Sequence, residues 1–181
     1  MNRTLRIAPV RKSILVQATP ERAFEVFTAG LDRWWPKSHG IGNSPVRASI
    51  IEPFVGGRWY TQCADGTEVV LGHVRVWQPS ERLVVSWEIS ADWKPDARVA
   101  FASEVEVRFQ AAPAGATRVE LEHRQFERMG AAQGATMRNN VDGGWPKLLQ
   151  LFAQAAAGAC TSAEDSSHTA HPSPNSTPSQ R

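Results

Sequence analysis

His123 occupies the position in this sequence that most favours chemistry. Residues 117–122 alternate apolar and charged side chains, and counting by twos from Thr117 through Val119 places His123 on the apolar face of a strand. An imidazole there could orient a ligand or act as a general base, with a pKa that burial would lower. A single inward-facing histidine is also common as a hydrogen-bonded core residue, so His123 is a candidate for either role.

Tryptophans supply most of the other candidate binding residues, since the chain has seven of them against one tyrosine. An indole brings a large apolar surface and one N–H donor, which suits either a thick core or the wall of a pocket. Trp87 shares strand parity with Leu83 and Val85 and is predicted to face inward. Trp59 is predicted to face inward as well, although the neighbouring Gly56-Gly57 pair could bulge its strand.

The entrance to such a pocket is predicted from two further segments. Trp34 and Trp35 are adjacent on a short helical stretch, and neighbouring helical residues point about 100° apart. One of the two indoles is therefore expected at a mouth or lid with His39 nearby, unless Trp35 caps the core and His39 is solvated. Trp93 lies in the loop 91–102, whose length and aromatic content suit a flap. The predicted ligand-binding residues are Trp35, His39, Trp59, Trp87, Trp93, His123 and Trp145.

Established catalytic motifs are missing from the sequence. It contains no Gly-x-Ser-x-Gly elbow, phosphate-binding loop, His-Glu-x-x-His or Cys-x-x-Cys pattern. The five histidines are too scattered to predict a metal site, and nothing in the chain indicates a cofactor.

Composition indicates one ordinary domain of 181 residues. The net charge is +2, and the basic N-terminal residues are not followed by a basic stripe, so nucleic acid is not an expected partner. No apolar run reaches about 18 residues, and the first residues lack a secretory signal, so we expect no membrane span and a cytoplasmic location. Cys63 and Cys160 are expected to be reduced thiols.

The elements that would position these residues follow from periodicity and turn chemistry. Residues 13–17 predict a first strand, and Thr19 and Pro20 predict the cap and first turn of a helix. A second short helical turn is expected to end before Pro36. Glycine- and proline-containing turns separate six further strands, which indicates an antiparallel sheet. These strands are predicted at residues 48–52, 56–63, 67–77, 82–90, 103–110 and 116–124.

The final element is predicted to be an amphipathic helix. Its apolar residues recur every three or four positions, at Val141, Trp145, Leu148, Leu149, Phe152 and Ala156. Pro146 lies inside this pattern, so we expect a kink or a restart near residue 145. Residues 12–157 are then the folded domain, residues 1–11 a flexible arm, and the Ser/Thr/Pro-rich residues 158–181 a disordered tail.

An ordered set of short motifs resembles one known family. The set includes Glu52-Pro53-x-x-Gly56-Gly57-Arg58-Trp59, Asp65-Gly66, Arg82-Leu83 and Gly144-Trp145. In this order the motifs resemble the family related to the activator of the heat-shock-protein-90 ATPase, within the START-like helix-grip (SRPBCC) superfamily. The resemblance implies an α+β fold, in which a curved antiparallel sheet of about seven strands grips a long C-terminal helix. It also implies two short helices between the first two strands and a cavity between sheet and helix.

Three functions remain open at this point. The first is a small-molecule binding protein that holds a hydrophobic or aromatic ligand between the sheet and the C-terminal helix. The second is a polyketide cyclase- or hydrolase-like enzyme that uses His123 as its base. The third is a co-chaperone-like module with a protein partner, although chaperone activators of the family usually carry a further N-terminal domain, and here only about a dozen residues precede the predicted fold.

Overall fold

A single curved sheet of seven antiparallel strands forms the body of the protein. The structure is a computed structural model and describes residues 6–158. The strand order is β1-β7-β6-β5-β4-β3-β2, so the first two strands of the chain form opposite edges. The strands are β1 (Val10–Val16), β2 (Val46–Ile51), β3 (Arg58–Cys63), β4 (Glu68–Gln78), β5 (Arg82–Trp87), β6 (Ser103–Ala112) and β7 (Ala116–Arg124). The predicted α+β fold class is confirmed.

Two short α-helices connect the edge strands, as the sequence predicts. They are α1 (Pro20–Phe27) and α2 (Leu31–Trp34), followed by the 3-10 turn η1 (Lys37–His39). The Thr19 hydroxyl accepts a hydrogen bond from the Arg22 amide, which is the predicted N-cap of α1. Three further 3-10 turns are η2 (Val99–Phe101), η3 (Pro113–Gly115) and η4 (Phe126–Met129).

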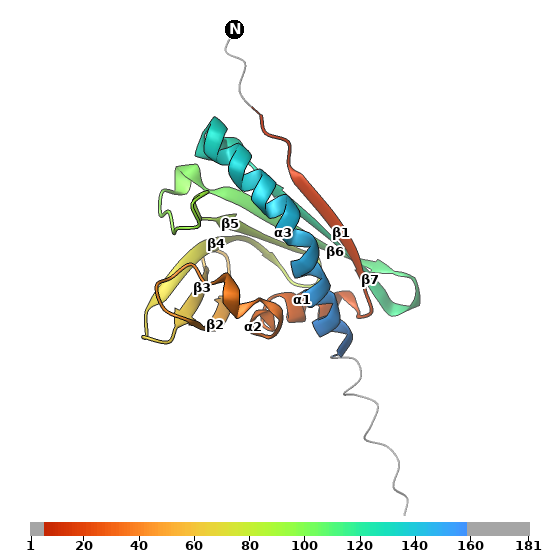
Figure 1. The fold of residues 1–181 in the computed structure, drawn as a ribbon. Helices are drawn as coiled ribbons and strands as arrows, with labels where there is room; N and C mark the ends of the chain where they lie inside the picture. Colours follow the sequence, from red (N-terminus) through yellow and green to blue (C-terminus); the bar gives the residue numbers. More distant parts are fainter. Residues whose placement is uncertain (1–5, 159–181) are drawn as a thin grey trace, which may run out of the picture.

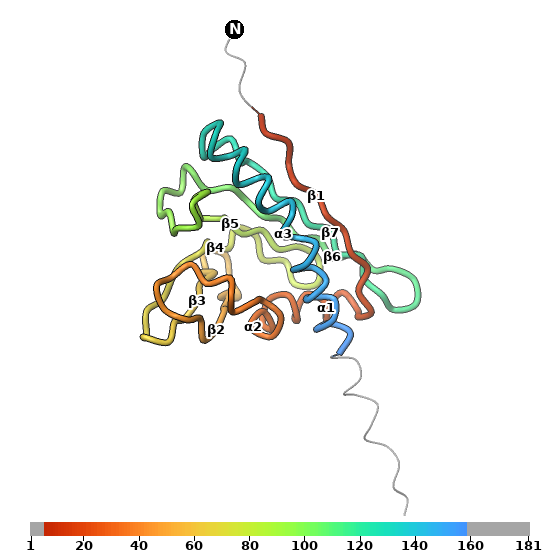
Figure 2. Tube along the Cα trace, viewed as in Figure 1, coloured from red at the N-terminus to blue at the C-terminus, as the bar shows by residue number. Residues whose placement is uncertain are grey.

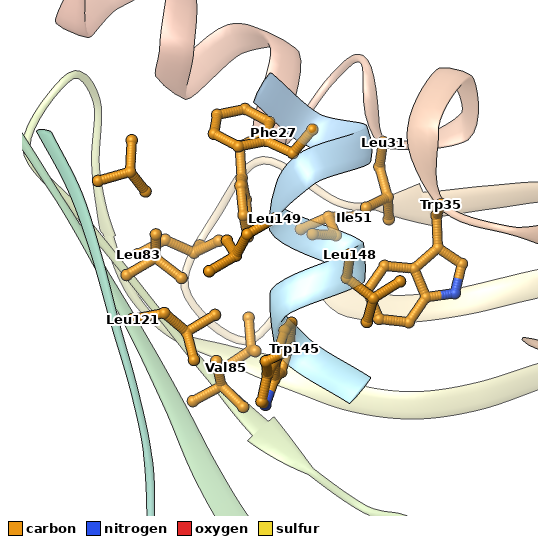
Figure 3. Packing of buried hydrophobic residues seen from close by; sticks show 14 of the residues in the cluster. Phe27, Leu31, Trp35, Ile51, Leu83, Val85, Leu121, Trp145, Leu148 and Leu149 are labelled. Atoms are coloured by element: carbon orange, nitrogen blue, oxygen red, sulfur yellow. The ribbon is translucent and has the colours of Figure 1, made fainter. Parts of the chain in front are cut away.

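The long helix α3 (Ala131–Gly158) lies across the concave face of the sheet (Figures 1 and 2). Its buried stripe includes the predicted residues from Val141 to Ala156 and extends back to Met137. Figure 3 shows Trp145, Leu148 and Leu149 extending from α3 among the side chains of the sheet and of the early helices. An ion pair between Lys12 of β1 and Asp142 of α3, at 2.7 Å, fastens the helix to the sheet edge.

Two boundaries differ from the prediction. The first strand begins at Val10, which pairs with His123, so Val10 and Arg11 belong to the sheet and not to the predicted arm. The helix α3 begins at Ala131, well before Val141. The buried Gly134 explains why periodicity missed its first turns: a Cβ there would lie 2.3 Å from the Phe126 carbonyl oxygen, so this inward position carries no apolar side chain.

Pro146 does not interrupt α3, contrary to the predicted kink or restart near residue 145. Its ring lies on the exposed side of the helix, where water can hydrogen-bond the carbonyl group that loses its donor. The disordered tail predicted from residue 158 onward and the thiol of Cys160 lie outside the described residues. Within residues 6–158, no helix combines the length and the apolar character that a membrane crossing requires.

The outer face of the sheet carries the charged residues that alternate with the core positions. Glu106 is almost fully buried among three arginines, and Arg82 donates to one of its carboxylate oxygens at 2.8 Å. Arg124 donates to the same oxygen at 3.0 Å, and Arg108 also contacts the carboxylate. Burial raises the pKa of Glu106, but the hydrogen bonds from the three arginines outweigh it and lower that pKa to about 2.

Candidate functional site

A cavity of about 410 Å³ lies between the sheet and α3 and is walled mainly by apolar side chains. Its four indoles, which we term the cavity tryptophans, are those of Trp35, Trp87, Trp93 and Trp145. Aliphatic side chains complete the wall, namely Ile41, Leu71, Ile89, Val141 and Leu148. The remaining lining residues are Ser38, His39, Gly40, Asn140 and Gly144. The volume lies within the range of small-molecule sites.

The mouth of the cavity is formed by η1, by the β5–β6 loop and by one side of α3. Its exposed lining residues are Ser38, His39 and Gly40 after α2, Trp93 in the loop and Asn140 on the helix. Trp93 is 46% exposed, as expected for a flap residue. Its backbone has a φ of 58°, a conformation that few non-glycine residues adopt, which fixes the path of the loop over the mouth.

A cluster of indoles forms the inner wall. Ring centroids are 5.3 Å apart for Trp35 and Trp59 and 5.4 Å apart for Trp59 and Trp87. The Trp145 ring completes the group at 5.9 Å from Trp87. The pairs are tilted or edge-on, the arrangements that aromatic quadrupoles favour. Trp59 does not line the cavity itself but supports Trp35 and Trp87 from behind.

Trp34 and Trp35 are both buried and His39 is exposed, which fits the alternative in which Trp35 caps the core and not the one in which an indole forms a lid. The helix α2 ends at Trp34, and Trp35 adopts an extended backbone with ψ at 124°, so the 100° rule for helical neighbours does not apply. Trp34 packs on Phe27 and donates its N–H to the Val26 carbonyl at 3.0 Å. Trp35 packs on Trp59 and presents one side to the cavity.

His123 is fully buried behind the cavity and does not line it. The Trp145 N–H donates to its Nδ1 at 3.2 Å, and Ser103 Oγ lies 2.8 Å from its Nε2. An indole nitrogen can only donate, so Nδ1 carries no proton, and in the neutral ring Nε2–H donates to Ser103. Burial lowers the pKa of His123 to about 3, so the ring stays neutral at physiological pH.

These contacts argue against His123 as a general base. Both of its nitrogens have partners, and the imidazole packs against the indoles of Trp87 and Trp145, which line the cavity in its place. Its role in this arrangement is to hold Trp145, one of the cavity tryptophans, in a fixed orientation. The geometry therefore supports the core-residue interpretation of His123.

Three buried indole N–H groups have no hydrogen-bond partner within the described residues. They belong to Trp35, Trp59 and Trp87, which are consecutive members of the indole cluster. An unpaired buried donor costs about 1–3 kcal/mol, and native proteins hold few of them. The indole cluster therefore holds three buried donors without a protein acceptor.

Polar groups at the site gather at the mouth. Ser38 and His39 come from η1, and Asn140 comes from α3. The charge of Lys147, two turns further along α3, reaches the imidazole of His39. Burial lowers the pKa of His39, and repulsion from Lys147 lowers it further. Within residues 6–158 no group of His, Cys, Asp and Glu side chains is arranged to hold a metal ion.

Leu71, Asn140 and Gly144 are among the lining residues that the sequence did not predict. A signal for the last two was present, because they lie four positions apart and so share one face of α3, at the edge of its apolar stripe. Strand parity did not predict the inward direction of Leu71, because a bulge shifts the β3–β4 register between Trp59 and Tyr60.

A curved antiparallel sheet that holds a C-terminal helix over a cavity defines the helix-grip class of proteins. Within that class, the chain belongs to the family described as Activator of Hsp90 ATPase homolog 1-like protein, whose model matches residues 17–157. The family predicted from the sequence motifs is therefore confirmed. No curated protein matched the chain.

Solved structures show the same fold, and two of them share substantial sequence identity with the chain. The anthrahydroquino-gamma-pyrone synthase Txn09, solved in a complex, is 40% identical over 83% of this chain and 97% of its own, with a TM-score of 0.59. CalC of Micromonospora echinospora, a self-sacrificing resistance protein, is 30% identical over 83% of this chain and 95% of its own, with a TM-score of 0.61. Protein MLL2253 of Mesorhizobium loti shares the fold at 17% identity, over 82% of this chain and 96% of its own, with a TM-score of 0.59.

Proposed function

We propose that this protein binds a planar aromatic small molecule in the cavity between the sheet and α3. The observation that carries the proposal is the cavity of about 410 Å³ walled by four indoles and by aliphatic side chains. Flat indole faces and edges suit an aromatic ring system, and polar groups only at the mouth suit a ligand whose functional group points outward. The identity of 40% with a synthase named for an anthrahydroquino-pyrone supports this ligand class.

The apolar wall can supply enough binding free energy for such a ligand. Burying about 200 Å² of apolar ligand surface contributes about 5 kcal/mol, and contact with the same area of cavity wall adds to it. Association entropy and ordering of the β5–β6 loop offset part of this gain.

The proposal is tested by filling the cavity from the helix side. Gly144 lines the cavity, and no atom lies within 4 Å of a Cβ built there, so Gly144→Leu places its side chain into the free volume. Gly143→Leu is the matched control, because its Cβ position is equally open but its side chain points away from the cavity. Both substitutions remove a helical glycine, and each is expected to stabilise α3 by up to about 1 kcal/mol.

Binding is measured by quenching of tryptophan fluorescence with anthraquinone-2-carboxamide. We expect at least a tenfold weaker affinity in Gly144→Leu and an unchanged affinity in Gly143→Leu. Equal affinities in both variants would place the ligand outside this cavity and refute the proposal.

A second candidate function is ring closure of an aromatic polyketide, favoured by the identity of 40% with Txn09. Since His123 is buried and fully hydrogen-bonded, the base in this case is His39, the one titratable side chain in the described lining of the cavity. Its lowered pKa keeps the imidazole neutral near pH 7, as a general base requires.

A suitable substrate is an anthrahydroquinone with a phenol beside a 1,3-diketone side chain. His39 removes the phenol proton, the oxygen attacks the distal carbonyl, and the adduct loses one water to give the γ-pyrone. Mass spectrometry of the reaction detects that loss of water. We expect His39→Gln to lower the rate at least a hundredfold and Lys94→Gln, an exposed loop substitution, to leave it unchanged. An unchanged rate in His39→Gln would exclude this mechanism.

A further inference from the structure

We infer that the ligand is acidic, and that its anionic oxygen group lies at the mouth of the cavity between η1 and α3, against His39 and Lys147. The inference deepens the proposed function and rests on it, because it assigns a charge to the aromatic molecule that the cavity holds. The polar groups at the mouth and the charges around it support the inference.

The mouth offers hydrogen-bond donors from two elements that face each other. Ser38 and His39 belong to η1, and Asn140 belongs to α3. Lys147 follows on the same helix, between the lining residues Trp145 and Leu148. Its ammonium group is exposed and forms no ion pair with any residue from 6 to 158. A free cation beside the hydroxyl group of Ser38 and the side-chain amide of Asn140 is suited to a carboxylate or a phenolate.

No carboxylate among the described residues lines the cavity. Three of the acids near these elements are already paired. Asp142 of α3 binds Lys12 at 2.7 Å. Asp32 of α2 binds Lys37, the other cation of η1.

The third paired acid directly follows β5. Glu88 follows the lining residue Trp87, but its carboxylate accepts from Ser86 and contacts His73 Nδ1, each at 2.8 Å, on the outer face of the sheet. On the β5–β6 loop, the exposed Asp92 and Lys94 flank Trp93 with opposite charges that cancel. The balance at the mouth is therefore positive.

The pair formed by His39 and Lys147 responds to an anion in a defined way. Burial and the charge of Lys147 both disfavour the protonated imidazole. An anion placed between the two groups removes the repulsion and favours protonation of His39. By linkage, the same anion binds more tightly as the pH falls and His39 takes up its proton. Lys37, the neighbouring cation on η1, is neutralised by Asp32 and contributes little to this response.

The inner wall adds no such donor. The N–H groups of Trp35 and Trp87 have no acceptor within the described part of the chain, but both are buried and are not exposed to the cavity. The N–H of Trp145 is taken by His123. The anionic group is therefore placed at the mouth.

The test compares two probes of the same shape and different charge. Anthraquinone-2-carboxylate carries one negative charge at pH 7, and anthraquinone-2-carboxamide carries none. We expect the acid to bind about three- to fivefold more tightly than the amide at low ionic strength, the range of an exposed ion pair. The difference should shrink in 0.5 M salt, because the mouth is open to solvent.

Two variants locate the source of the preference. Lys147→Gln is expected to reduce the ratio of the two affinities to about one while leaving the amide affinity unchanged. Arg118→Gln removes the same charge from the outer face of β7 and is expected to retain the full preference. Lowering the pH from 8 to 5.5 is expected to tighten binding of the acid only, and His39→Gln is expected to abolish that change.

The outcomes separate this inference from the proposed function. Equal affinities for acid and amide in the wild-type protein, with quenching by both, would overturn the inference and leave the proposed function standing. A preference that persists in Lys147→Gln would also overturn it, because the anion would then lie elsewhere. If neither probe quenches tryptophan fluorescence, the proposed function fails and this inference fails with it.

Discussion

Replacing His123 with glutamine should remove a defined part of the pH dependence of stability. The imidazole is fully buried, and burial lowers its pKa to about 3, against an ordinary value of 6.5. The unfolded chain therefore takes up a proton as the pH falls below 6.5, whereas the native state does not. Stability from this group is complete above pH 6.5 and is lost as the pH falls from there towards 3.

The magnitude follows from linkage alone. At His123 the unfolded state binds about 0.2 of a proton more than the native state at pH 7 and nearly one more at pH 5, and a difference of one proton is worth 1.36 kcal/mol per pH unit. Integration over that interval gives a loss of about 2 kcal/mol in the free energy of unfolding. This value depends only on a native pKa well below 5, and the carboxylates, whose lowered pKa values lie below this window, add little to it.

Urea unfolding of the wild-type protein and of His123→Gln at pH 7, 6 and 5 measures this term. Glutamine keeps one donor and one acceptor near Trp145 and Ser103 but does not titrate. The wild-type protein should lose about 2 kcal/mol more than the variant between pH 7 and pH 5. Parallel pH profiles would show that His123 titrates normally in the native state, and the assignment of a buried neutral imidazole would be wrong.

Three further substitutions test the fold and the site. Gly72→Ala should lower the free energy of unfolding in urea by about 3 kcal/mol or more, because a Cβ there would lie 1.8 Å from the Ser86 carbonyl oxygen and would separate β4 from β5. A loss below about 1 kcal/mol would contradict this packing. Glu106→Gln should lower the free energy of unfolding by about 2 kcal/mol at pH 7, because three arginines lose their shared carboxylate. The difference from the wild-type protein should vanish as the pH falls from 4.5 towards 2, because the wild-type carboxylate is then protonated. Trp93→Ala should change the free energy of unfolding by less than about 1 kcal/mol, because the indole is 46% exposed. The same substitution should weaken binding of anthraquinone-2-carboxamide about fivefold. An unchanged affinity would show that the loop is not part of the binding site.

Strand parity predicted the direction of several site residues but not what lies in front of them. Trp59, Trp87 and His123 all face inward, as alternation in their strands requires. Only Trp87 of these lines the cavity, because the indoles of Trp35 and Trp145 stand between the other two and the free volume. The alternation of residues along a strand predicts which face of the sheet a side chain lies on. It does not predict whether that side chain lines the cavity, because this depends on contacts between elements far apart in sequence.

Local rules failed where an element ended or carried a glycine. The predicted divergence of Trp34 and Trp35 assumed a continuous helix, but the backbone becomes extended at Trp35 and turns both indoles inward. The first turns of α3 were missed because the inward position at Gly134 is kept empty by the Phe126 carbonyl. The strands were predicted well because their turns contain glycine, proline and aspartate at short spacings.

The most direct test of the central claim is the response of the tryptophan indole N–H resonances to anthraquinone-2-carboxamide in two-dimensional ¹H–¹⁵N NMR. The chain has seven tryptophans, and each gives one such resonance. We predict that the resonances of the four cavity tryptophans shift on titration. Those of Trp34, which donates to a backbone carbonyl, and Trp77, which packs against Phe24 away from the cavity, should stay in place. Shifts confined to Trp34 and Trp77, or no shifts at all at saturating ligand, would contradict a binding site between the sheet and α3.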